Sequence, residues 1–237
     1  MRGSKELVEI GPRDAPARSV IDWALRRVRT AGVRRAAVVT TEDKHDLRRA
    51  LSTAEGRDDW PRTQAVFTPC TPSSVHTVAA AMDQEPEAQW LLVFPDILTA
   101  PPSAARALVH HAARSTADVS LCLVPSDRPE KADMVEIDEN SRLLGLAIKQ
   151  PDQGLRFTWV YACWQPTFTA LLERELRRPS RRTDADSELF FGHVLLAALD
   201  AGLVIDTISF EDGFALDIGT PDDLRRAREE PDPRFFG

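Results

Sequence analysis

Two short apolar runs, Trp90–Phe94 and Val119–Val124, constrain the fold of this chain more than any other feature. Both runs are hydrophobic at nearly every position, whereas a strand with one face in water alternates hydrophobic and polar residues. A strand that is hydrophobic on both faces lies in a sheet that helices cover on both sides. The two runs therefore predict buried strands of a wound α/β sheet.

The first half of the chain alternates between helical and strand patterns. From Val20 to Ala31, hydrophobic residues recur at helical spacing, and the pattern ends at Gly32, as expected for a helix packed on a sheet. The alternation continues to the second apolar run. We predict strands at 36–40, 64–67, 90–94 and 119–124, and helices at 20–31, 42–51, 74–82 and 103–114.

The second half is richer in strand patterns, and we expect antiparallel strands to join the sheet there. Thr220 and Pro221 are typical of a helix N-terminus, since Thr is a favoured N-cap and Pro is tolerated in the first turn. We expect 178–186 to be disordered and the tail 231–237 to be loosely held. We predict strands at 134–137, 143–148, 157–164, 204–210 and 214–217, and helices at 166–177, 188–201 and from 221 onward.

Composition bounds the domain organisation and the classes of partner. A chain of 237 residues, 43% of them hydrophobic, can fold as one domain spanning 1–237. The formal net charge of -7 disfavours nucleic acid as a partner, and arginine runs such as Arg26, Arg27 and Arg29 are interpreted as solvated surface. The cysteines show no metal-ligand spacing, and no stretch is long and apolar enough to span a membrane. We therefore expect a soluble, cytoplasmic protein.

Two aspartates, Asp96 and Asp217, stand at the ends of predicted strands. Wound sheets bind ligands beyond the carboxyl ends of their strands. Two carboxylates there would supply hard oxygen ligands for Mg²⁺, which in turn bridges phosphate oxygens. The alternative is that Asp96 caps a turn before Pro101 and that Asp217 begins a turn at Gly219. The spacing alone leaves both interpretations open.

A set of short segments extends this interpretation beyond the two aspartates. The segments are Ser4-Lys-Glu-Leu-Val8, Phe94-Pro-Asp96, Met134-Val-Glu-Ile-Asp138, Ile148-Lys149, Thr158-Trp159 and Asp217-Ile-Gly-Thr-Pro221. In this order they resemble sugar-phosphate nucleotidyltransferases of the glucose-1-phosphate thymidylyl- and uridylyltransferase type. The resemblance runs from Ser4 to Arg228, and the last segment is its most specific part. It implies the fold of the nucleotide-diphospho-sugar transferases, a Rossmann-like wound mixed sheet in three α/β/α layers.

The resemblance also assigns roles to charged residues. It makes Lys5 a catalytic residue that neutralises phosphate charge, and Asp96 and Asp217 the catalytic aspartates that hold Mg²⁺. Lys149 would contact the sugar phosphate, although Gln150 follows it where the family has proline. The implied reaction is attack of a sugar-1-phosphate oxygen on the α-phosphorus of a nucleoside triphosphate, with release of pyrophosphate.

Three further residues are candidates for substrate binding. Trp159 stands where many relatives have a glycine against the sugar, so we expect it to line the substrate pocket and narrow it. Ser73 and Ser74 precede a predicted helix, and backbone N–H groups at a helix N-terminus favour anions such as a nucleotide phosphate. A plain N-cap is the alternative for these serines.

One part of the family pattern is absent from the sequence as given. The family opens with a strand and a Gly-rich loop that grips the triphosphate, and both precede the lysine matched by Lys5. Only four residues precede Lys5 here. We therefore expect this chain to turn over little substrate, and a catalytically inactive relative that binds a nucleotide sugar or a protein partner is the alternative function. The sequence leaves open whether the chain forms a homo-oligomer.

Overall fold

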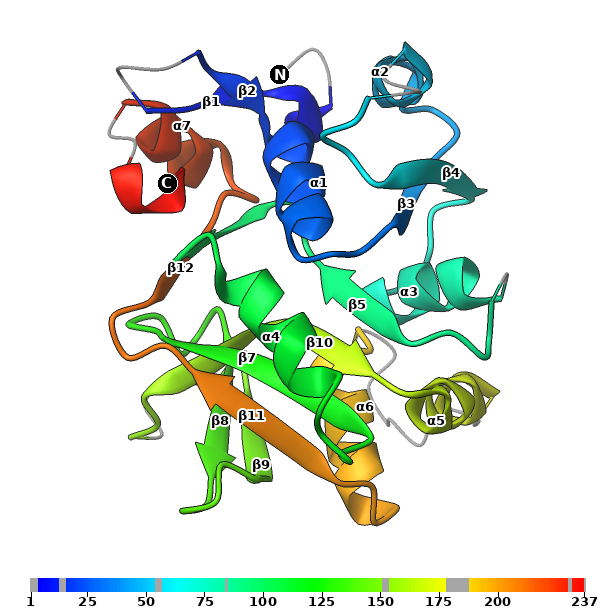
Figure 1. Ribbon diagram of the computed structural model, residues 1–237, viewed down its shortest axis with the longest axis vertical. Coiled ribbons are helices and arrows are strands. Elements are labelled where there is room, and N and C mark those ends of the chain that lie inside the picture. The colour runs from blue at the N-terminus through cyan, green and yellow to red at the C-terminus, as the bar shows by residue number, and fades with distance from the viewer. Residues whose placement is uncertain are drawn as a thin grey trace.

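The computed structural model describes residues 4–12, 16–53, 57–83, 85–150, 154–177, 188–229 and 232–236. Helices and strands alternate through the first half, as predicted (Figure 1). The helices are α1 (Val20–Thr30), α2 (His45–Thr53), α3 (Ser74–Met82), α4 (Ala104–Ala112), α5 (Pro166–Arg177), α6 (Phe191–Asp200) and α7 (Pro221–Glu229), with 3₁₀ turns η1 (Lys5–Leu7) and η2 (Pro233–Phe235). The strands are β1 (Glu9–Ile10), β2 (Arg18–Ser19), β3 (Arg35–Thr41), β4 (Arg62–Thr68), β5 (Trp90–Val93), β6 (Ile97–Ala100), β7 (Val119–Pro125), β8 (Asp133–Ile137), β9 (Leu143–Ile148), β10 (Phe157–Trp164), β11 (Ile205–Ser209) and β12 (Phe214–Asp217).

The largest sheet has six strands with β7 and β10 at its centre. The order is β11-β7-β10-β8-β9, and β5 pairs with β10 beside the end of β8. β11 runs parallel to β7, whereas β5, β7 and β8 are antiparallel to β10. The antiparallel additions expected for the second half are therefore present, and the sheet is mixed.

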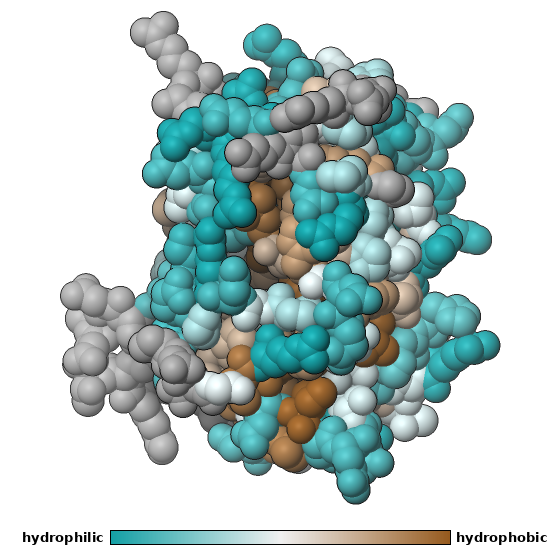
Figure 2. Space-filling view, turned by 90° about the vertical axis from the view of Figure 1, so that its left-hand side faces the viewer, coloured by the Kyte–Doolittle hydropathy of each residue, from teal (hydrophilic) through white to brown (hydrophobic). Residues whose placement is uncertain are grey.

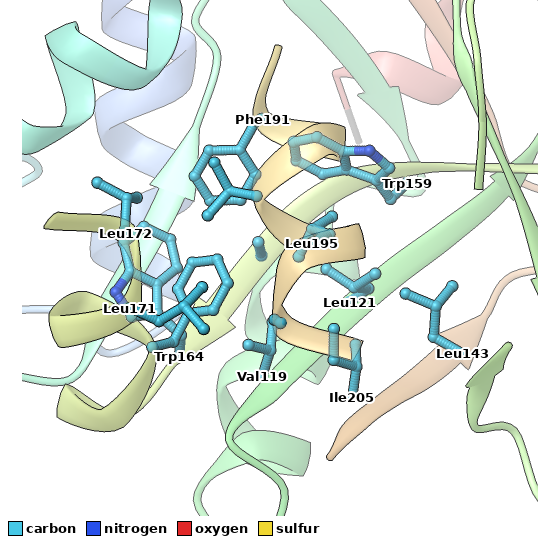
Figure 3. Packing of buried hydrophobic residues seen from close by; sticks show 14 of the residues in the cluster. Val119, Leu121, Leu143, Trp159, Trp164, Leu171, Leu172, Phe191, Leu195 and Ile205 are labelled. Carbon is cyan, nitrogen blue, oxygen red and sulfur yellow. The ribbon is translucent and has the colours of Figure 1, made fainter. Parts of the chain in front are cut away.

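Helices cover both faces of this sheet. Leu121 and Leu123 of β7 face a core formed with α3, α5 and α6, part of which Figure 3 shows around Leu121, Phe191 and Leu195. The alternate residues Cys122 and Val124 face a second core with α4. This two-sided burial explains why β7 is apolar at nearly every position. The arrangement is the three-layer α/β/α architecture expected from the sequence.

Among the described residues, three two-stranded sheets accompany the main one, and β1 and β2 form the shortest, an antiparallel pair. β3 and β4 form a parallel pair, and β6 and β12 form an antiparallel pair. Among the described residues, β3 pairs only with β4 and β5 pairs only with β10. A cavity of about 1220 Å³ lies between them, lined by α1, β3, α3 and β5. The indole nitrogen of Trp90 in β5 is buried there without a hydrogen-bond partner.

Two expectations about the surface are wrong. Phe235 in the tail is 2% exposed and packs on Phe214 with ring centroids 4.5 Å apart, so the described tail residues 232–236 are anchored. Arg27 is 7% exposed rather than solvated, because its guanidinium donates a hydrogen bond to the carbonyl oxygen of Phe235. The segment 178–186, predicted to be disordered, lies outside the described residues. None of the described helices is long and apolar enough to cross a membrane.

Candidate active site

The two aspartates identified from the sequence lie on neighbouring strands. Asp96 occupies the turn between β5 and β6, and Asp217 ends β12 directly opposite Ile97, the first residue of β6. The backbone N–H of Ile218 donates to the carbonyl oxygen of Asp96 at 2.9 Å. The antiparallel pairing of β6 and β12 therefore brings together two acids that are far apart in the sequence.

Lys5 joins this pair of acids. Its ammonium Nζ lies 2.6 Å from Oδ2 of Asp96. Burial lowers the pKa of Lys5, but the hydrogen bond and charge of Asp96, with the charges of Glu6 and Asp217, outweigh burial and raise the pKa above 10.5. Lys5 is therefore protonated at neutral pH and supplies a fixed positive charge beside both carboxylates.

The segment that carries Lys5 is anchored at two points. Ser4 donates from its backbone nitrogen to Oδ2 of Asp46 at 2.7 Å and from its hydroxyl to Oδ1 at 2.5 Å. These bonds lower the pKa of Asp46 to about 2, against a small opposing effect of desolvation. Glu6 is buried and pairs with Lys44 at 2.8 Å. The turn η1 is thus held in place, although it lies near the start of the chain.

Asp96 and Asp217 form a donor set that suits a hard divalent cation. Oδ2 of Asp96 is taken by Lys5, and Oδ1 of Asp217 accepts the N–H of Gly219 at 2.6 Å. One oxygen of each carboxylate remains for a metal, and Mg²⁺ commonly binds through one or two carboxylates plus water and phosphate oxygens. The Gly219 contact also shows that Asp217 begins a turn, so its structural and metal-binding interpretations are compatible.

Both aspartates line a cavity of about 970 Å³. On the side of the molecule that carries β12 and α7, Figure 2 shows hydrophobic residues at the floor of a hollow with a hydrophilic rim. Three other predicted binding residues, Ser74, Lys149 and Trp159, line the same cavity. The basic side chains along it are Arg128, Lys131, Lys149, Arg156, Arg226 and Arg234.

Lys149 follows β9 with a positive φ of 49°. Its backbone N–H donates to the carbonyl oxygen of Ala132 at 3.1 Å, and its ammonium lies 3.5 Å from the ring centroid of Phe190. The aromatic face stabilises the cation without neutralising its charge. The ammonium therefore remains able to bind an anion in the cavity, and its contact with a sugar phosphate stays a prediction.

Trp159 forms an aromatic wall of the cavity. Its ring lies 5.9 Å from that of Phe94 and 5.4 Å from that of Phe191, measured between centroids. Asp133, an acid at the start of β8, lines the same cavity as Trp159. The sequence pattern predicted this strand from residue 134 and so left out Asp133; a charged residue next to an apolar strand was the available signal.

The two serines before α3 have different surroundings. Ser73 is buried and acts as the N-cap of α3, with its hydroxyl 2.8 Å from Nδ1 of His76. Ser73 does not line the 970 Å³ cavity, whereas Ser74 does. The N-cap alternative therefore describes Ser73, and only Ser74 is placed to meet a bound molecule.

A known protein family matches most of the chain. Residues 1–200 match the sequence profile of the MobA-like NTP transferase domain. A comparison with curated protein sequences finds no match.

Solved structures share the fold at low sequence identity. A Bacillus anthracis protein assigned as a glucose-1-phosphate thymidylyltransferase, in complex with sucrose, has a TM-score of 0.79 and 14% identity, covering 96% of this chain and 86% of that one. The T. maritima inositol-1-phosphate CTP transferase has a TM-score of 0.67 and 21% identity, with 87% and 79% coverage. A UDP-glucose pyrophosphorylase complexed with UDP-glucose has a TM-score of 0.75 and 13% identity, with 94% and 88% coverage.

Proposed function

Because the chain belongs to the MobA-like NTP transferase family, we propose that it transfers a nucleotidyl group from a nucleoside triphosphate to a sugar-1-phosphate. An oxygen of the sugar phosphate attacks the α-phosphorus, the bond from that phosphorus to the bridging oxygen breaks, and pyrophosphate leaves with the electron pair. This transfer is complete without a nucleophile from the protein. We also propose that residues 1–237 act as one domain, in the cytoplasm.

The observation that carries this proposal is the contact of Lys5 with Asp96, which lines a large cavity together with Asp217. Phosphoryl-type transfer depends on positioning and on stabilising negative charge, and this cluster offers both. Lys5 brings a permanent positive charge that the phosphates can share. Asp96 and Asp217 would hold Mg²⁺, which supplies further positive charge to phosphate oxygens when bound.

The rest of the cavity supports a phosphorylated acceptor. Lys149 offers an ammonium that packs on the ring of Phe190, and Trp159 offers an aromatic wall. Phosphates bind ammonium groups, and sugar rings pack on aromatic faces. The structural neighbours named above act on glucose-1-phosphate, inositol-1-phosphate and UDP-glucose, so a sugar or cyclitol phosphate is the acceptor class we propose.

The test is a pyrophosphate-release assay. The purified protein is incubated with Mg²⁺, each of the common nucleoside triphosphates in turn, and a panel of sugar-1-phosphates plus myo-inositol-1-phosphate. We expect measurable turnover with at least one pair, at the low rate expected from the sequence, and we expect Lys5→Met to lower kcat by about 10²–10³-fold, the cost of removing one preorganised charge donor. The matched control is Arg106→Met, which removes an exposed cation of α4. Equal loss in both variants, or no pyrophosphate from any pair, would contradict the proposal.

A further inference from the structure

Asp133 is an acid in the cavity that the reaction described above does not use. It begins β8, lies opposite Ile148 in β9, and lines the cavity together with Lys149 and Trp159. Its backbone is fixed by Thr158, whose hydroxyl donates to the carbonyl oxygen of Asp133 at 3.0 Å. The position of this carboxylate is therefore set by three strands, β8, β9 and β10.

The carboxylate itself lies close to the start of α6. A Cβ atom at residue 192 would lie 2.6 Å from Oδ2 of Asp133, so only glycine allows α6 to approach this closely. Burial raises the pKa of Asp133, and interactions with Trp159, Lys149 and Gly192 only partly offset this.

The carboxylate retains capacity for a ligand. An ionised carboxylate offers about four acceptor sites, and the hydrogen bond from Thr158 goes to the backbone carbonyl of Asp133 and leaves its carboxylate free of that donor. Because Asp133 lines the cavity, the remaining acceptors are open to a bound molecule. A phosphate would be repelled by this carboxylate, whereas a hydroxyl group would donate to it. The ammonium of Lys149, which interacts with the charge of Asp133, has the opposite preference: it attracts a phosphate.

From this juxtaposition we propose that Asp133 determines acceptor specificity, with its carboxylate accepting a hydrogen bond from a ring hydroxyl of the phosphorylated acceptor whose phosphate Lys149 binds. This inference rests on the proposed function, since it concerns the acceptor of that reaction. Acceptors that lack the hydroxyl leave this half-buried carboxylate without that donor, and such unpaired groups give strong discrimination.

A purely structural role predicts a different behaviour. If Asp133 only held Trp159 and α6 in place, its substitution would weaken the binding of every ligand by the same factor. A role in specificity predicts that the effect depends on the hydroxyl pattern of the ligand. The experiment must therefore compare ligands and not only variants.

The experiment measures acceptor binding by titration calorimetry without nucleotide. The probes are glucose-1-phosphate, galactose-1-phosphate, mannose-1-phosphate and myo-inositol-1-phosphate, followed by the monodeoxy analogues of the best binder. In the unaltered protein, we expect one deoxy analogue to bind about 10–100-fold more weakly than its parent, as for a hydrogen bond to a charged group. This measurement needs no variant and so does not depend on a variant that folds.

Variants then assign the effect to the residue. We expect Asp133→Asn, which keeps the shape and one acceptor oxygen, to reduce the discrimination to about threefold or less. Glu136→Gln, the same change at an exposed position of β8, should retain the full discrimination. The inference is overturned if no deoxy analogue loses affinity in the unaltered protein, if Asp133→Asn weakens all analogues equally, or if no parent compound binds. Discrimination in binding without pyrophosphate release would instead disprove the proposed function alone.

Discussion

The Lys5 ammonium and the Asp96 carboxylate lie 2.6 Å apart although 91 positions separate them in the sequence. The contact joins the turn η1 to the turn between β5 and β6, and Asp217 adds its charge from β12. Because Lys5 contacts Asp96 and interacts with the charge of Asp217, it stays protonated up to a pH above 10.5. The positive charge of Lys5 is therefore constant across the physiological pH range.

Removing either acid should weaken metal binding. We expect Asp96→Asn and Asp217→Asn each to raise the Mg²⁺ concentration for half-maximal activity by about tenfold or more, because each removes one charged oxygen ligand. Excess EDTA should abolish turnover by the unaltered protein, and added Mg²⁺ should restore it. The measurement is a Mg²⁺ titration of pyrophosphate release, with the exposed Glu136→Gln variant as a control. Unchanged Mg²⁺ dependence in both variants would show that other groups bind the metal.

The Ser4 anchor should matter for activity more than for folding. Asp46→Asn weakens the two hydrogen bonds that hold Ser4, so Lys5 should sample more conformations and kcat should fall about 3–10-fold. The depressed pKa of Asp46 means that its contribution is complete above pH 3.8 and disappears as the pH falls through about 2. Steady-state kinetics and amide exchange of residues 4–8 test this. The exposed Asp83→Asn variant is the control, and equal kinetics in both would refute the anchoring role.

Asp133 should give the protein a measurable pH dependence of stability. Its pKa is raised by burial, so between pH 3.8 and the raised value the folded state binds more protons than the unfolded state. The free energy of unfolding must therefore fall as pH rises through this window. We expect Asp133→Asn to remove this part of the dependence, so that the variant gains stability relative to the unaltered protein as the pH rises above 3.8. Urea unfolding at several pH values measures the difference, and parallel curves would contradict the assignment.

The C-terminal tail should contribute to global stability. Phe235 is buried against Phe214, and its carbonyl oxygen binds the buried Arg27. Phe235→Ala should cost about 3 kcal/mol of unfolding free energy through lost burial and the cavity that remains. Phe67→Ala, at a side chain that is 37% exposed, is the matched control and should cost much less. Chemical denaturation checks both, and a loss of less than about 1 kcal/mol at Phe235 would show that the tail is dispensable.

Local patterns in the sequence predicted the main sheet because a strand buried on both faces, such as β7, is hydrophobic at nearly every position. They also placed Asp96 and Asp217 at strand ends. They did not predict β6, since Ile97–Ala100 lies between two prolines and becomes a strand only by pairing with the distant β12. The sequence did not predict the burial of Arg27 and Phe235 either, because the hydrogen bond between them joins segments about 200 positions apart. Contacts with distant segments determine whether such residues form a strand or are buried, and local hydrophobic periodicity does not predict those contacts.

The cavity between β3 and β5 lies beside a part of the molecule that we expect to open more readily than the main sheet. α1, α2, β3 and β4 share a small core of their own around Leu25, Leu47 and Trp60, apart from the larger cores of the main sheet. Segments with few shared contacts open as separate cooperative units, at a lower free energy than global unfolding. Amide protons of β3 and β4 should therefore exchange with deuterium earlier than those of β7 and β10. When this unit opens, the backbone edges of β3 and β5 that border the cavity could pair with a strand of another molecule. We therefore expect self-association to begin from this early-exchanging unit.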